Sequence, residues 1–172
     1  MPRARASDGE RETRGRVLAA YAIMIHAFCT IFMTTRRSKY TPRGYRFSVR
    51  RSSAGKGLFA EEDIPKGMCV IEYTGTVLNE EEAEAAAGRK YLFEVSRRVT
   101  IDGNVPSNLA RYINHSCAPN CESVVRGGRV FIFSLTRIKA GDELSYDYGA
   151  EYFDEFIKPH GCRCVRHRGG RE

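Results

Sequence analysis

What this chain of 172 residues lacks already narrows its function. No convincing secretory signal precedes the six cysteines, which argues against an extracellular disulfide scaffold and favours a reducing, intracellular compartment. No glycine-rich run has the spacing of a phosphate loop or a dinucleotide fingerprint. The body of the chain also lacks a basic excess, since Gly44 to Lys158 holds 15 Lys and Arg against 17 Asp and Glu.

Positive charge is instead concentrated in the flanks. The net charge of the whole sequence is +7, and the residues outside 44–158 contribute 13 basic and 4 acidic side chains. A slightly acidic body suits a cationic peptide better than a phosphate backbone. We therefore expect a basic protein partner and no direct sequence-specific binding of nucleic acid.

Residues 1–43 form a basic N-terminal extension with one apolar segment. Residues 17–35 are uncharged over 19 positions, which is marginally long enough to cross a bilayer, and cationic residues on both sides leave its orientation undecided. Three interpretations stay open: a membrane anchor, a helix packed on the domain or on a partner, and an upstream extension that the working protein lacks, with Met33 as an internal start. Cys29 and Cys69 lie in apolar runs and are expected to be unreactive thiols.

The body of the chain alternates between short strand patterns and turns that contain glycine. Gly127 and Gly128 predict a two-residue hairpin turn. One helix is clear, over residues 79–89, because Asn79 can cap it and three glutamates follow at its N-terminus. Strands are expected at 45–50, 68–73, 91–95, 99–101, 122–126, 129–135 and 143–148, with a loop at 52–57. The pattern predicts a mostly β fold with few short helices.

Two passages are unusually rich in chemically capable side chains. In the first, an apolar pair is followed by an amide, an imidazole, a hydroxyl and two thiols, which gain nothing from burial unless something bonds them. The second, at 141–149, combines acidic residues with Tyr146 and Tyr148. The residues of the first passage are Asn114, His115, Ser116, Cys117 and Cys121.

Five passages together resemble, in their order, the SET-domain protein lysine methyltransferases. They are Gly-Lys-Gly-Leu-Phe-Ala at 55–60, Ile-Glu-Tyr-Thr-Gly at 71–75, Tyr-Leu-Phe at 91–93, Arg-Tyr-Ile-Asn-His-Ser-Cys at 111–117 and Glu-Leu-Ser-Tyr-Asp-Tyr-Gly at 143–149. The resemblance implies a SET domain over 44–150, built of small curled antiparallel sheets, in which residues 111–117 thread beneath a later loop like a pseudoknot. Residues 151–172 resemble a shortened, basic post-SET tail.

This resemblance implies transfer of a methyl group from S-adenosylmethionine to a lysine of a basic protein, such as a histone, a ribosomal protein or a DNA-binding protein. Tyr148 matches the catalytic tyrosine, and a tyrosine at position 146 leans toward a monomethyl product. Phe153 and Phe156 are expected to close the lysine channel. The family's cofactor contacts fall on Lys56, Gly57, Leu58, Tyr91, Arg111, Asn114, His115 and Tyr148. The expected location is the cytoplasm, or the nucleus in a eukaryote. The alternative is a catalytically silent module that binds lysine-rich tails.

The resemblance also implies a zinc site in the tail. Cys162 and Cys164, joined by Cys117, would give three thiolates to one tetrahedral zinc ion. The family's next cysteine is missing, because Gly169 stands at its position. His167 is the candidate fourth ligand and Cys121 a poorer one, with free thiols as the alternative.

Overall fold

The computed structural model describes residues 38–167, and these belong, from Lys39 onward, to one compact unit. The apolar segment 17–35 and Cys29 lie outside the described residues. Within the described part, no helix is long and apolar enough to cross a membrane.

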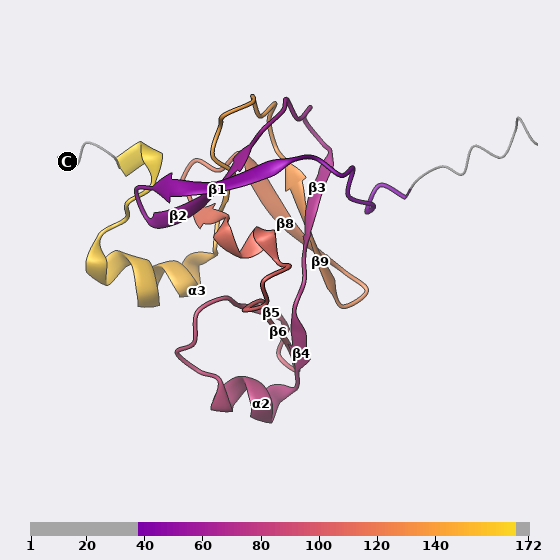
Figure 1. Cartoon of the computed structure of the whole chain (residues 1–172). Helices are drawn as coiled ribbons and strands as arrows, with labels where there is room; N and C mark the ends of the chain where they lie inside the picture. The colour runs from indigo at the N-terminus through magenta and orange to yellow at the C-terminus, as the bar shows by residue number, and fades with distance from the viewer. Residues whose placement is uncertain (1–37, 168–172) are drawn as a thin grey trace, which may run out of the picture. The chain divides into compact units, whose positions relative to one another are not determined.

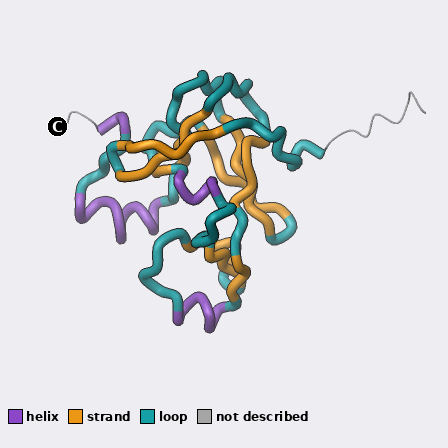
Figure 2. Tube along the Cα trace, viewed as in Figure 1, coloured by secondary structure: helices purple, strands orange, loops and turns teal. Residues whose placement is uncertain are grey.

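The described residues fold into four small sheets (Figures 1 and 2). One is an antiparallel hairpin of β1 (Phe47–Ser52) and β2 (Gly55–Ala60). A second has the order β3 (Cys69–Tyr73), β9 (Arg129–Ser134), β8 (Cys121–Arg126), and a third the order β4 (Thr76–Leu78), β6 (Val99–Asp102), β5 (Leu92–Ser96); both are antiparallel. The last is a two-residue parallel pair of β7 (Asn114–His115) and β10 (Ser145–Tyr146).

Helical segments are few and short. They are α2 (Glu80–Ala85), α3 (Ala150–Tyr152), the 3-10 turns η1 (Leu109–Tyr112), η3 (Lys158–His160) and η4 (Val165–His167), and the π-helical turn η2 (Phe153–Ile157). In Figure 1, α2 and the β4–β6–β5 sheet gather at one end, and α3 lies near the β1–β2 hairpin. The mostly β fold of small sheets with few short helices is as predicted.

The predicted cap of α2 is confirmed. The Asn79 side chain accepts the Glu82 N–H at 3.0 Å, and the Glu82 carboxylate accepts the Asn79 N–H at 2.9 Å, so two donors at the helix N-terminus are satisfied together. The helix ends at Ala85, earlier than predicted, and Gly88 follows with φ at +81°.

Three other sequence predictions need correction. The predicted loop at 52–57 contains the start of β2, because the hairpin turn needs only Ser53 and Ala54. The strand predicted over 143–148 pairs as a strand at Ser145–Tyr146 alone. Helical turns over 150–160 also join the one helix predicted clearly in the body, and within them the Tyr152 and Phe156 rings lie 4.8 Å apart.

The core draws its buried side chains from all parts of the body. Its fully buried members include Leu58, Ile64, Val70, Ile113, Ile132, Ile138 and Leu144. Two turns far apart in sequence meet there, because Ile64 and Ile138 exchange backbone hydrogen bonds of 2.8 and 2.9 Å. The parallel β7–β10 pair, extended by the bond from Ser116 N–H to the Tyr146 carbonyl at 3.1 Å, sets residues 111–117 beside the later segment, as the threaded arrangement requires.

Packing continues on the N-terminal side of residue 44. The Tyr40 ring lies 5.5 Å from the Phe131 ring and 5.6 Å from the Phe133 ring, centroid to centroid. Residues of the predicted extension therefore cover part of the β3–β9–β8 sheet. The boundary at 44 itself stays a prediction.

Candidate active site

A row of aromatic rings leads from the core to the surface. Neighbouring ring centroids in this row, which we call the aromatic row, are 6.4, 4.8, 5.1 and 4.8 Å apart; its members, in order, are Phe93, Tyr146, Tyr148, Tyr152 and Phe156. Tyr146 is 8 % exposed, whereas Tyr152 and Phe156 are 43 % and 47 % exposed. The row is therefore most buried at Tyr146 and open to solvent at Tyr152 and Phe156.

The two central tyrosines of the row use their hydroxyls differently. The Tyr148 hydroxyl donates to the Ile113 carbonyl at 2.7 Å, which fixes it against the residue that precedes β7. The Tyr146 hydroxyl has no hydrogen-bond partner among residues 38–167, although the side chain is almost fully buried. A hydroxyl without a protein partner is available to a guest in the row.

Both tyrosines remain neutral phenols near pH 7. Burial raises the pKa of Tyr146 well above its ordinary value, and burial, followed by the nearby Tyr152, raises the pKa of Tyr148. Neither hydroxyl can act as an ionised base under these conditions. Their contribution is hydrogen bonding and shape.

The raised pKa values predict a specific loss of stability at high pH. In the unfolded chain a tyrosine ionises near pH 10, whereas burial keeps Tyr146 protonated in the folded chain. The unfolded state therefore releases its proton first, and each such group lowers the free energy of unfolding by about 1.4 kcal/mol per pH unit above pH 10. Tyr146→Phe should remove one such contribution, measured by urea unfolding between pH 9 and about 11. Tyr45→Phe, a partly buried tyrosine outside the row, is the control, and equal slopes for all three proteins would contradict the prediction.

The Asn114 side chain connects β7 to β2 and to the segment that precedes β10. Its amide donates to the Lys56 carbonyl at 3.0 Å and to Glu143 Oε1 at 2.8 Å. The other carboxylate oxygen, Oε2, accepts the Ser52 hydroxyl at 2.8 Å. The same carboxylate explains why position 57 is glycine, because a Cβ on Gly57 would collide with it. Gly57 therefore allows the Glu143 carboxylate to approach the β2 backbone closely.

The predicted cofactor residues lie on two neighbouring strands and in a separate group. Lys56, Gly57 and Leu58 are on β2, next to Asn114; the Leu58 side chain is fully buried, and its carbonyl accepts the Leu144 N–H at 2.8 Å. Only the backbone of Leu58 can therefore face a ligand.

The other group consists of the predicted residues Arg111 and Tyr91, which lie beside Tyr112; the Tyr112 ring centroid is in turn 5.8 Å from Lys56 Nζ. The Arg111 guanidinium lies 5.4 Å from the Tyr91 ring centroid and 4.8 Å from that of Tyr112. Its Nε is buried without a hydrogen-bond partner among the described residues. Such an orphaned donor fits an acceptor atom of a bound ligand.

A hollow of about 530 Å³ lies beside this part of the chain. Gly55, Lys56 and Tyr112 line it together with Val49, Arg50, Arg51, Pro106 and Leu109. The lining combines apolar residues with three cationic side chains, which suits a small ligand with an anionic group. Asn114 and His115 are not among its lining residues.

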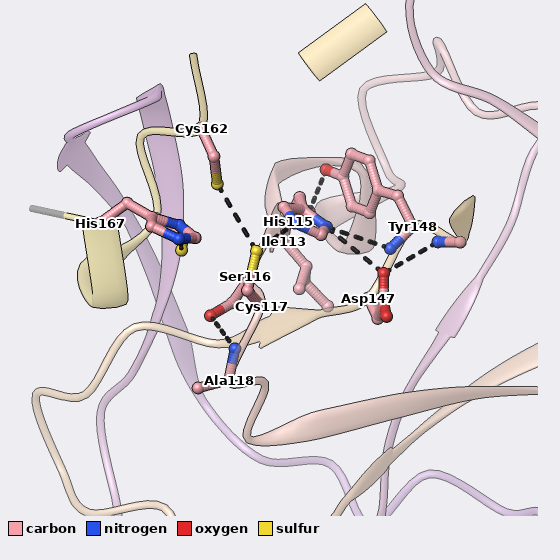
Figure 3. Close-up of polar contacts among 11 residues, drawn as sticks. Ile113, His115, Ser116, Cys117, Ala118, Asp147, Tyr148, Cys162 and His167 are labelled. Carbon is pink, nitrogen blue, oxygen red and sulfur yellow. Dashed lines mark hydrogen bonds and ion pairs between the residues drawn. The ribbon is translucent and has the colours of Figure 1, made fainter. Parts of the chain in front are cut away.

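His115 lies between the aromatic row and the cysteines (Figure 3). Its Nδ1 accepts the Tyr148 N–H at 3.3 Å, and its Nε2 lies 3.3 Å from Cys117 Sγ. Burial lowers the pKa of the imidazole, partly offset by Asp147, whose Oδ1 lies 3.6 Å from Nδ1. The ring is therefore neutral near pH 7; because Nδ1 accepts, Nε2 carries the hydrogen and donates to sulfur.

Three sulfurs and one imidazole converge next to His115. The ligand atoms of Cys117, Cys162, Cys164 and His167 all lie within 4.8 Å of one another, and the first two sulfurs are 3.8 Å apart (Figure 3). A tetrahedral zinc ion with Zn–S bonds of about 2.3 Å has ligand–ligand edges of about 3.8 Å, so the donor set and spacing fit zinc. Cys121 is not in the cluster and is buried in β8.

The thiol electrostatics agree with a cation site. Burial and the adjacent Cys162 thiol raise the pKa of Cys117. Burial also opposes ionisation of Cys164, but hydrogen bonds from the Cys117 and His167 backbone outweigh it and lower its pKa to about 6. The Cys164 thiolate therefore forms readily, whereas burial and the neighbouring thiols oppose ionisation of Cys117 unless a metal ion neutralises the charge.

Sequence reasoning missed two residues of this site, Tyr152 and Glu143. Tyr152 continues the ring row, and a signal for it exists, since Tyr148, Tyr152 and Phe156 follow one another at intervals of four residues. Glu143 anchors Asn114, and no local signal reveals this because its partner is 29 residues away in the chain.

Comparison with known protein families defines the class. The family model of the SET domain matches residues 55–149, more than half of the chain, and the chain belongs to the SET-domain family.

Curated proteins similar to this chain include histone-lysine N-methyltransferases. They are trithorax of Drosophila virilis (35 % identical over 147 residues), 2D of Homo sapiens (37 % over 129) and ASHH3 of Arabidopsis thaliana (34 % over 128). The matches cover 79 %, 69 % and 67 % of this chain but 4 %, 2 % and 34 % of those proteins. The chain therefore spans only a small part of the length of the first two relatives and about a third of the other.

Proposed function

We propose that this SET domain is a protein-lysine N-methyltransferase, which moves a methyl group from S-adenosylmethionine to a lysine side chain and leans toward monomethylation. The observation that carries the proposal is the aromatic row, with Tyr148 fixed by the Ile113 carbonyl and a free Tyr146 hydroxyl beside it. A row open at Tyr152 and Phe156 can admit the apolar stem of a lysine and enclose its amine.

The row addresses the main obstacle to lysine chemistry, which is the charge of the amine. A free lysine has a pKa near 10.4, so presenting neutral amine at pH 7.4 costs about 4 kcal/mol. Buried neutral rings disfavour the ammonium form and reduce that cost. The same rings exclude water and restrict the amine to few orientations. Holding the amine nitrogen in line with the methyl group accounts for much of the rate of such a transfer.

We assign the cofactor to the side of β2 that carries Lys56 and Gly57. S-adenosylmethionine, when bound, supplies an electrophilic methyl group on a sulfonium sulfur. Its anionic carboxylate suits the cationic hollow at Gly55 and Lys56 and the unpartnered Nε of Arg111. Tyr91 and the Asn114–His115 strand complete the proposed cofactor residues, as do Leu58 through its backbone and Tyr148.

We assign zinc to Cys117, Cys162, Cys164 and His167, with His167 replacing the missing cysteine. Cys117 lies two residues after β7, and the other three ligands come from the tail. The ion would hold the tail, with Tyr152 and Phe156, against the rest of the site. We keep residues 1–43, 44–150 and 151–172 as the proposed division into extension, SET domain and tail.

A histone is the substrate that we propose first, because the similar proteins are named histone-lysine N-methyltransferases and the body of the chain is slightly acidic. A nuclear location follows from that substrate.

The direct test is incubation of the purified chain with methyl-labelled S-adenosylmethionine and core histones, followed by mass spectrometry. We expect label on lysine, and the cofactor should raise the melting temperature, since a 100-fold excess over its Kd adds about 2.7 kcal/mol. A thermal shift without transfer to histones or to a cell lysate would favour the silent lysine-binding module. No thermal shift would contradict the cofactor proposal.

Tyr146→Phe should change the product rather than the first step. Removing the free hydroxyl deletes a bond to the amine and opens room for about one methyl group or water, while the ring packing against Phe93 and Tyr148 is kept. We expect the first methylation to stay within about threefold of wild type and di- or trimethyl-lysine to appear, as mass spectrometry of a peptide product can show. An unchanged distribution of mono-, di- and trimethyl-lysine would contradict the role of Tyr146.

A further inference from the structure

Both ring nitrogens of His115 are committed to protein partners. Nδ1 accepts the Tyr148 N–H and Nε2 faces Cys117 Sγ, each at 3.3 Å. The side chain is 6 % exposed, and its ring packs 5.6 Å from the Tyr148 ring and 5.3 Å from the Phe153 ring. Neither ring nitrogen of this imidazole is left for a ligand.

Asn114 and His115 face opposite sides of β7, as successive residues of a strand do. The Asn114 amide points to Lys56 and Glu143, on the side of the proposed cofactor residues. The His115 ring points to Cys117 and Tyr148, on the side of the cysteine cluster and the aromatic row (Figure 3). The family resemblance assigns both residues to the cofactor, and within the protein their side chains contact different elements.

We propose that His115 is a positioning residue whose imidazole links the metal-binding cysteine cluster to the backbone of Tyr148. The Nε2–H donates to the Cys117 sulfur, and the resulting tautomer leaves Nδ1 free to accept the Tyr148 N–H. The orientation of the ring is thereby set at both ends. The catalytic consequence rests on the proposed function, whereas the two hydrogen bonds do not.

The two bonds have separate consequences. A donor on a ligating thiolate stabilises its charge and fixes its direction, and loss of such an outer contact typically costs 10- to 100-fold in metal affinity. The bond to Tyr148 fixes the backbone from which the catalytic ring projects. A misplacement of about 1 Å there can cost 10²-fold in rate.

Two amide substitutions separate the bonds. In His115→Asn the side-chain oxygen can take the place of Nδ1 but nothing reaches Cys117. In His115→Gln the longer amide can take the place of the Nε2 donor but leaves the Tyr148 N–H without its acceptor. His160→Gln, at an exposed histidine in the tail, is the matched control.

The readouts are Co²⁺ affinity, followed through the sulfur-to-cobalt charge-transfer band, and hydrogen exchange of the Tyr148 amide. We expect His115→Asn to lose 10- to 100-fold in Co²⁺ affinity while its Tyr148 amide stays protected. For His115→Gln we expect near wild-type Co²⁺ affinity, faster exchange at Tyr148, and a kcat about 100-fold lower at unchanged KM for S-adenosylmethionine.

Three results would overturn the link: a wild-type chain without the charge-transfer band, wild-type values of both readouts in both variants, or a raised KM for S-adenosylmethionine as the sole effect. This last result, a raised KM alone, would indicate that the His115 ring contacts the cofactor instead. A wild type that binds Co²⁺ but transfers no methyl group would refute the proposed function, while Co²⁺ affinity and amide exchange would still decide the link.

Discussion

Tyr148→Phe is expected to slow every methylation step about 100-fold without changing the number of methyl groups added, because alignment is lost when its anchor is removed. The hydroxyl bond to the Ile113 carbonyl holds the ring beside Tyr146, and phenylalanine cannot make it. The folded domain should persist, since the ring still packs against His115 and Tyr152. Single-turnover kinetics with a histone peptide, and urea unfolding of the same protein, measure the two effects.

Tyr45→Phe controls for loss of a phenol outside the aromatic row and should keep the wild-type rate. The contrast with Tyr146→Phe is the sharper comparison, since the two variants remove hydroxyls from rings 4.8 Å apart. Tyr148→Phe should slow every methylation step, and Tyr146→Phe should change the number of methyl groups in the product. Full activity in Tyr148→Phe would refute the anchoring role assigned to that hydroxyl.

Zinc should be present at about one ion per chain and should be lost in Cys162→Ser and in Cys164→Ser, because a serine oxygen is a poor replacement for thiolate on zinc. Without the ion, nothing neutralises the remaining thiolates, and the tail should separate from Cys117. Tyr152 and Phe156 belong to that tail, so methyl transfer should fall with the metal. Atomic absorption and activity assays on the same samples test both statements.

Cys121→Ala is the matched control, because Cys121 is a cysteine of the same signature passage that lies outside the cluster. It should keep its zinc. A metal-free wild type with full activity would show that the cluster works as free thiols, and zinc lost from Cys121→Ala would move the fourth ligand from His167 to Cys121.

Features with a local cause could be predicted from the sequence. The hairpin at Gly127 and Gly128 follows from the ease with which glycine adopts φ values of +57° and +74°, and Arg126 pairs with Arg129 as the turn requires. The cap at Asn79 follows from the side chains of Asn79 and Glu82 alone. Neither depends on the rest of the chain.

Features with a long-range cause could not be predicted in this way. β7 is two residues long and exists because Ser145–Tyr146 lies beside it, so residues 114–115 carry no strand pattern of their own. Tyr146 and Tyr148 were found through the family resemblance, whereas Glu143 meets Asn114 only across 29 residues of chain. The tail itself turns back as α3 and η2. The metal ligands were predicted by residue type, but their meeting point depends on the same turn of the tail.

The aromatic row also gives the protein an optical property. The chain has nine tyrosines and no tryptophan, so no indole signal hides their near-ultraviolet bands and emission. Tyr146, Tyr148 and Tyr152 lie with ring centroids 4.8 and 5.1 Å apart, close enough for their transitions to couple. A lysine entering the row would perturb this coupled set directly. If lysine binds in the row as proposed, we therefore expect the near-ultraviolet circular dichroism of the unlabelled protein to change on binding.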